Sequence, residues 1–180
     1  MTRRFDRDGR GRKIHMQSLG AIQHFDFNDP ASYSYEQAVL TIQKLGLGMD
    51  VVEQQYKRAV FNVVARNQDD HVKNISFLMD RSGSWRLSPA YDVAYAYNPQ
   101  GAWTRDHQMS LAGKRNDFRH DDLMAFASTV GLKPARAMQA IEHVVGSVEM
   151  WGEYAEQAGV EPLDVGRVAQ TFRLGPRGLP

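Results

Sequence analysis

Two carboxylates and one amide stand in this sequence at a spacing that suits the transfer of a phosphoryl group. Asp69 precedes Asn74 by five positions, and Asp92 follows after a segment that reads as a short β-hairpin. A transferring phosphoryl group spreads negative charge that Mg²⁺ must neutralise, while a base orients the attacking hydroxyl. Asp92 and the amide of Asn74 supply the hard oxygen ligands that magnesium prefers, which leaves Asp69 to accept or steer the hydroxyl proton. We therefore expect Asp69 to be the catalytic residue, and Asn74 and Asp92 to be metal ligands.

The sequence around these residues resembles the C-terminal catalytic region of the HipA-like serine/threonine kinases, which are toxins of bacterial toxin–antitoxin pairs. The resemblance extends over residues 61–97 and is carried by two runs, NQDDHVKN ending at Asn74 and SPAYD ending at Asp92. Two flanking runs are also similar to the family, RFDR at residues 4–7 and MSLAGK at residues 109–114. The C-terminal helices match the family only in their general pattern.

The resemblance implies a protein kinase that uses Mg²⁺ and takes ATP as its substrate. In the family's pattern Asp69 is the catalytic residue, Asn74 and Asp92 bind the metal, and His71 and Lys73 lie beside the phosphates. The sequence departs from other protein kinases at one of these positions, because His71 stands two residues after the catalytic Asp, where they have a lysine. The triplet Asp-Val-Ala that begins at Asp92 likewise replaces their Asp-Phe-Gly.

Two parts of a complete kinase are missing from the sequence. It contains no Gly-x-Gly-x-x-Gly loop and no lysine in a Val-Ala-Ile-Lys context. Both parts normally lie in an N-terminal lobe that covers the ATP phosphates. We therefore expect the chain to be one lobe of two, which needs an N-lobe supplied in cis or in trans.

The fold class we expect is mainly α, the helical C-terminal lobe of a protein-kinase-like fold with a small β-hairpin at the catalytic site. A single domain over residues 1–180 is expected, because 180 residues with 42% hydrophobic content can form a proper core. Within it we expect an irregular hinge-side segment at 1–33, the catalytic loop and metal segment at 34–97, a helical bundle at 117–174 and a tail at 175–180.

Helix start signals precede the candidate site. Ser34 and Gln37 have the pattern of a capping box that opens a helix ending near Gly46, and Asp50 with Glu53 opens the next helix. The apolar residues of this second helix recur at helical spacing and should lie in the core: Val52, Tyr56, Ala59, Val60, Val63 and Val64. The second helix should therefore deliver the catalytic loop at its C-terminal end.

A hairpin is predicted between the two halves of the site. Two β-rich runs, Ile75–Met79 and Trp85–Leu87, are joined by a turn at residues 80–84. The reversal should bring Asp92 close to Asn74, so that both can share one cation.

The last half of the chain is expected to be helical after one long loop. Residues 98–116 have no clear periodicity and read as a loop that covers the core, with the border of a substrate cleft as the other interpretation. Asp117 is expected to cap a helix running toward Gly131, and Pro134 and Pro162 to start two further helices.

Composition excludes several other classes of protein. Zero Cys rules out disulfides and thiolate zinc sites, and the six His residues show no His-Glu-x-x-His spacing. A net charge of +1 gives no general attraction to nucleic acid, so direct nucleic-acid binding is not expected. The basic run near the amino terminus reads as a solvated turn: Arg3, Arg4, Arg7, Arg10, Arg12 and Lys13. With no signal peptide and no long apolar run, we expect a cytoplasmic protein without a membrane role.

Three hypotheses about function fit these patterns. The first is a kinase that phosphorylates Ser or Thr of a protein substrate, which the family's habits imply is translation-related. The second is a kinase-derived binding module that does no phosphotransfer and binds an N-lobe partner or an antitoxin-like DNA-binding protein. The third is a phosphate–metal hydrolase that uses Asp69 and Asp92 with water, although such an enzyme does not need Asn74 or Lys73 at their positions.

Overall fold

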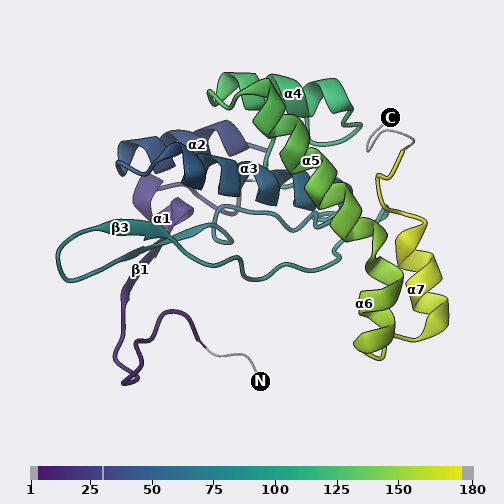
Figure 1. Ribbon diagram of the computed structural model, residues 1–180, viewed down its shortest axis with the longest axis horizontal. Helices are drawn as coiled ribbons and strands as arrows, with labels where there is room; N and C mark the ends of the chain where they lie inside the picture. Colours follow the sequence, from purple (N-terminus) through teal and green to yellow (C-terminus); the bar gives the residue numbers. More distant parts are fainter. Residues whose placement is uncertain (1–3, 30, 176–180) are drawn as a thin grey trace.

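Seven helices and a three-stranded sheet make up the part of the chain that the computed structural model describes, residues 4–29 and 31–175. In chain order the elements are β1 (His15–Ser18), α1 (Leu19–Gln23), α2 (Tyr35–Lys44), α3 (Met49–Val64), β2 (Ser76–Met79), β3 (Trp85–Leu87), α4 (His120–Thr129), α5 (Pro134–Glu149), α6 (Trp151–Gln157) and α7 (Pro162–Ala169). Helices α2 to α5 lie together on one side of the sheet, and α6 and α7 follow at the far end of α5 (Figure 1). The prediction of a mainly helical fold with a small β element is confirmed.

The sheet contains the predicted hairpin and one strand that was not predicted. Its strands pair antiparallel in the order β1-β2-β3, so β2 is central. Ser18 lies opposite Ser76, and Phe77 lies opposite Leu87. The prediction that residues 1–33 are irregular is wrong for His15–Gln23, which form β1 and α1. A four-residue strand carries little periodicity of its own and takes its register from a partner far along the chain.

The two helices before the site begin differently. In α2 the predicted capping box is present: Gln37 N donates to Ser34 Oγ at 3.2 Å, and Ser34 N donates to Gln37 Oε1 at 2.8 Å. In α3 the helix predicted to open at Asp50 is present, but its N-cap is Gly48, two residues earlier, and Asp50 lies inside the first turn. There the carboxylate still meets the positive end of the helix dipole. A Cβ atom on Gly48 would lie 2.6 Å from Asp50 Oδ1, so a side chain at this cap position would require the Asp50 carboxylate to move.

Helix α3 is the centre of the core and packs against α2 and α5. All six of its predicted core residues are buried: Val52, Tyr56, Ala59, Val60, Val63 and Val64. The Tyr56 ring stacks on Phe126 of α4 with 5.5 Å between centroids, and its hydroxyl donates to the carbonyl O of Leu123 at 3.1 Å. The chain that leaves the end of α3 therefore starts from a rigid support.

The C-terminal half follows the proline signals but not the Asp117 signal. Asp117 does not cap α4; it has a φ of +50°, and the cap position is Arg119, whose backbone N donates to the Asp122 carboxylate at 2.7 Å. Asp117, Asp121 and Asp122 stand close together at this point, so spacing alone does not show that the Asp122 carboxylate is the one that binds the cap backbone. The predicted helix starts at Pro134 and Pro162 are confirmed. Of the predicted tail at 175–180, residues 176–180 lie outside the described residues.

The N-terminal arm, residues 4–14, neutralises much of its own charge. The Asp6 carboxylate lies 2.7 Å from Arg4 and 2.6 Å from Arg7, and the Asp8 carboxylate lies 2.7 Å from Arg12. The hydrogen bond from Arg4 is the main cause that lowers the pKa of Asp6 to about 2, so this carboxylate is charged at neutral pH. The arm turns back on itself through an isolated bridge between its two sides, as the sequence predicts.

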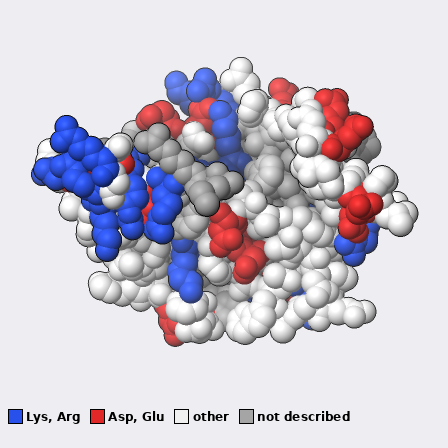
Figure 2. Space-filling model, turned by 90° about the horizontal axis from the view of Figure 1, so that it is seen from below, with Lys and Arg blue, Asp and Glu red and all other residues white. Residues whose placement is uncertain are grey.

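Lys and Arg side chains gather on one side of the face seen in Figure 2, with acidic side chains next to some of them. Arg3 of the predicted basic run lies outside the described residues. The local ion pairs of the arm suit a solvated turn better than an anion-binding patch. Among residues 4–29 and 31–175, no helix is long and apolar enough to cross a membrane.

Replacing Ser34 by Ala should destabilise the protein by about 1 kcal/mol, because one N-terminal amide of α2 loses its side-chain acceptor. The free energy of unfolding from urea titration measures the effect. Ser32→Ala is the matched control, since Ser32 is exposed and precedes the cap. Equal stability of the two variants would show that the capping box contributes nothing measurable.

Candidate functional site

The site loop, which we define as residues 65–74, is tied down on two sides. Asn67 returns to α3, where its backbone N donates to the carbonyl O of Asn62 at 3.0 Å and its Nδ2 to Asn62 Oδ1 at 2.9 Å. Gln68 is fully buried, and its Nε2 donates to the carbonyl O of Arg105 at 2.7 Å. The loop is therefore held between α3 and the long segment that precedes α4.

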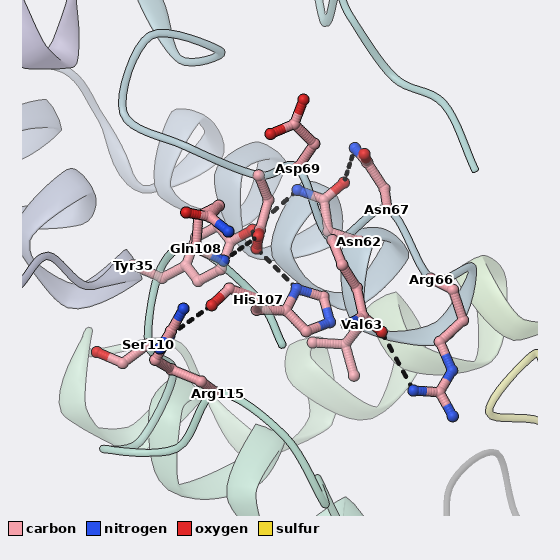
Figure 3. Close-up of polar contacts among 12 residues, drawn as sticks. Tyr35, Asn62, Val63, Arg66, Asn67, Asp69, His107, Gln108, Ser110 and Arg115 are labelled. Carbon is pink, nitrogen blue, oxygen red and sulfur yellow. Dashed lines mark hydrogen bonds and ion pairs between the residues drawn. The ribbon is translucent and has the colours of Figure 1, made fainter. Parts of the chain in front are cut away.

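Asp69 reaches out of this loop into solvent. Its side chain is exposed, and Figure 3 shows its carboxylate directed away from the hydrogen-bonded cluster beneath it. Its backbone O accepts a hydrogen bond from Asn74 Nδ2 at 2.9 Å. Because only the nitrogen of an amide can donate, this bond leaves Asn74 Oδ1 as the atom available to a cation. An exposed carboxylate can in turn accept a hydroxyl proton.

Asn74 and Asp92 line the same cavity. About 30 Å³ inside it is free, which is room for one or two waters or an ion. The reversal at the hairpin thus brings the two residues together, as the sequence predicts. The described lining of this cavity does not include Asp69 or Lys73. The role of Asn74 and Asp92 as metal ligands stays a prediction.

Asp92 is held in an uncommon backbone conformation by its neighbours. Its φ is +54°. The preceding residue, Tyr91, shares a hydrogen bond of 2.5 Å with Ser76 Oγ on β2, and Arg58 of α3 donates to the carbonyl O of Ser88 at 2.7 Å. A non-glycine residue keeps such a conformation only where its surroundings over-determine it, and such positions cluster at functional sites.

The two residues predicted to lie beside phosphates have different surroundings. His71 lines the cavity, and its buried Nδ1 has no hydrogen-bond partner among the described residues. Lys73 is exposed and turns toward Phe27, with Nζ 3.2 Å from the ring centroid, as in a cation–π contact. The structure therefore places His71 beside Asn74 and Asp92, whereas Lys73 would have to leave Phe27 to reach a phosphate there.

Sequence reasoning missed the importance of Asp70, which is only 2% exposed. Its Oδ2 accepts from Tyr35 Oη at 2.6 Å and from His107 Nδ1 at 2.8 Å, and its Oδ1 accepts from Gln108 N at 2.8 Å. The three donor residues are labelled in Figure 3. Burial, and then the charge of Asp70, raise the pKa of Tyr35, so its hydroxyl keeps the proton that it donates. Asn62 Nδ2 completes the cluster by donating to Tyr35 Oη at 2.8 Å.

The segment 98–116 therefore does more than cover the core. Its buried residues His107 and Gln108 supply two of the three donors to Asp70. The only sequence signal for Asp70 is the Asp-Asp pair itself, and two adjacent carboxylates look alike until burial distinguishes them.

The donor set suits a cation that arrives with a phosphate rather than one held by the protein alone. No group of three or more His, Cys, Asp or Glu that could hold a metal occurs among residues 4–29 and 31–175. Mg²⁺ is commonly bound through one or two carboxylates together with substrate phosphates and waters. Asp92 and Asn74 can supply such a partial set.

Comparisons with known proteins give one family and one fold. The family model described as the HipA-like C-terminal domain matches residues 1–151. No curated protein matches the sequence. A similar solved structure is HipA of Shewanella oneidensis MR-1, from a toxin–antitoxin complex with HipB and operator DNA, with a TM-score of 0.68 and 18% identity. The match covers 93% of this chain and 41% of that chain, so this chain spans less than half of it.

The two adjacent aspartates should differ strongly in how much the same substitution destabilises the protein. Asp70→Asn should lower the free energy of unfolding by about 2–4 kcal/mol, because the new amide nitrogen faces a hydrogen-bond donor in a buried site. Asp69→Asn should change it by less than about 0.5 kcal/mol, since that side chain is exposed. Urea unfolding of both variants measures this difference. A similar loss of unfolding free energy in both variants would mean that the buried contacts of Asp70 do not stabilise the protein more than the exposed side chain of Asp69 does.

Proposed function

Because this chain belongs to the family of HipA-like C-terminal domains, we propose that it is the C-terminal lobe of a Mg²⁺-dependent serine/threonine protein kinase. The observation that carries the proposal is the cavity shared by Asn74 and Asp92, with exposed Asp69 tied to Asn74 through its backbone. ATP is the phosphoryl donor, and an N-lobe in cis or in trans covers it.

Each residue of the site has a role in this reaction. Asp92 and Asn74 Oδ1 hold Mg²⁺, which neutralises the phosphates of ATP. Asp69 accepts or steers the proton of the attacking Ser or Thr hydroxyl. His71 lies on the phosphate side, because it lines the same cavity as the two metal ligands. Lys73 joins it only if nucleotide draws its ammonium away from Phe27.

The partners follow from the family. HipA of Shewanella oneidensis MR-1 was solved with HipB and operator DNA, so an antitoxin-type partner is proposed for this chain as well. The proposed substrate is a translation-related protein, and the proposed place of action is the cytoplasm. Contact with DNA would be made through the partner.

A second candidate function is a binding module that joins an N-lobe or an antitoxin-like protein without phosphotransfer. The observation that favours it is the position of Lys73, whose ammonium lies over Phe27 and outside the cavity. In that case the complex forms, but the site transfers no phosphoryl group.

Mg-ATP should bind the chain in a calorimetric titration, and Asp92→Asn should abolish the binding, because the variant loses the carboxylate ligand of the cation. Asp106→Asn is the matched control, since that carboxylate lies away from the cavity lining. Binding that is equal in the wild type and Asp92→Asn would contradict the metal site. No binding in either would favour the non-catalytic module.

With an N-lobe supplied, Asp69→Asn should keep Mg-ATP affinity but slow phosphorylation of a protein substrate by about 100-fold or more, because it removes the general base. Incorporation of radioactive phosphate measures the rate. Full activity in the variant would remove Asp69 from the mechanism. A stable partner complex with no activity, even in the wild type, would instead support the binding module.

A further inference from the structure

Arg173 approaches the site loop from the C-terminal end of the chain. It lies outside residues 1–151, to which the family model applies, and is only 8% exposed. Its Nη1 lies 3.1 Å from His107 Nε2, and its Nη2 donates to Asn116 Oδ1 at 3.0 Å. Arg173 therefore contacts His107, which in turn contacts Asp70.

These contacts determine the state of His107. An arginine nitrogen donates and cannot accept, so His107 Nε2 must be the unprotonated acceptor. The proton of the imidazole then lies on Nδ1, which donates to Asp70 Oδ2 at 2.8 Å. His107 is consequently neutral, and its ring forms a hydrogen bond with the Asp70 carboxylate on one side and with the Arg173 guanidinium on the other.

The charge of Asp70 is compensated across this ring. The one ion-pair contact of Asp70 within the described residues is with His107, which is neutral in this arrangement. Burial lowers the pKa of Arg173 to about 10, which still leaves the guanidinium charged at neutral pH. A buried carboxylate is costly unless it is hydrogen-bonded and balanced by a positive charge, and Arg173 supplies that charge.

Arg173 also binds the other end of the site loop. Its Nη1 donates to the carbonyl O of Val63 at 2.6 Å, and its backbone N donates to the carbonyl O of Val64 at 3.0 Å. These carbonyls belong to the last turn of α3, where they lack helical partners and where the helix dipole favours a cation. One side chain thus connects the helix end before the loop with Asp70 inside it.

We propose that Arg173 is a positioning residue, which sets the geometry of the site loop through α3 on one side and through His107 and Asp70 on the other. Asp69 follows directly before Asp70, and Asn74 is tied to the backbone of Asp69, so an error in the loop moves the base and a metal ligand together. The consequence for catalysis rests on the proposed function; the consequence for loop geometry does not.

The test uses the full chain with Arg173→Met, Mn²⁺ alone as the metal probe, and NMR of the loop amides and the histidine nitrogens. In the wild type, His107 should show a protonated Nδ1 and an unprotonated Nε2. In the variant, the amide signals of residues 68–74 should shift or broaden, and Mn²⁺ affinity should fall by about tenfold or more, as for other residues that orient metal ligands. Free guanidinium ion should restore part of that affinity in Arg173→Ala.

Arg167→Met is the matched control, because Arg167 lies on α7 with its side chain 75% exposed and, among the described residues, forms an ion pair only with the nearby Asp164. It should leave the loop signals and Mn²⁺ affinity unchanged. If Arg173→Met fails to fold, Arg173→Lys takes its place, since it keeps the charge but not the planar fork that reaches both acceptors. A smaller change in the same loop signals is then expected.

The proposal is overturned if wild-type His107 carries its proton on Nε2, or if the folded Arg173 variant keeps wild-type loop signals and Mn²⁺ affinity while losing only stability. Failure of the proposed function gives a different result: the wild type then does not bind Mn²⁺ in a way that Asp92→Asn abolishes. In that case the loop signals and the His107 tautomer still decide the role of Arg173.

Discussion

A buried carboxylate next to an exposed one is the constraint on which the site depends. Asp70 is almost completely removed from water, so its charge must be met by donors of the protein. Those donors come from α2 and from the segment before α4, as Tyr35, His107 and Gln108. Because three donors from two separate parts of the chain converge on one side chain, the backbone at Asp70 has little freedom. The backbone next to Asp69 is therefore held in place, while the Asp69 side chain extends into solvent.

Structural support and exposed oxygen atoms thus come from adjacent residues of the chain, Asp70 and Asp69. The same division recurs at the other half of the site, where Tyr91 is anchored to β2 and Asp92 stays exposed. In each case the anchored residue contributes packing and hydrogen bonds, and the adjacent residue keeps its oxygen atoms free. In such a site the anchored residues fix the positions of the exposed carboxylates, so the carboxylates themselves need not take part in packing.

Half-buried or buried arginines connect the segments of the site. Arg58, Arg66 and Arg173 each donate to a backbone carbonyl from another part of the fold. The acceptors are Ser88, Thr171 and Val63. Burial lowers the pKa of all three guanidinium groups, yet the ordinary arginine value is high enough that each keeps its charge at neutral pH. The planar fork lets one such residue satisfy several acceptors that would otherwise be unpaired.

Features that depend on residues close together in the chain could be read from the sequence. The capping box at Ser34, the helix starts at Pro134 and Pro162, the core face of α3 and the β2–β3 hairpin could all be predicted. Spacing and family resemblance likewise singled out Asn74 and Asp92, which the fold places along one cavity.

Four other features emerge from the folded chain alone: which of two adjacent aspartates is buried, the pairing of β1 with β2, the contact of Lys73 with Phe27, and the contact of Arg173 with His107. Each of these depends on contacts between segments far apart in sequence. Burial and charge compensation are properties of such contacts, so no local pattern could encode them.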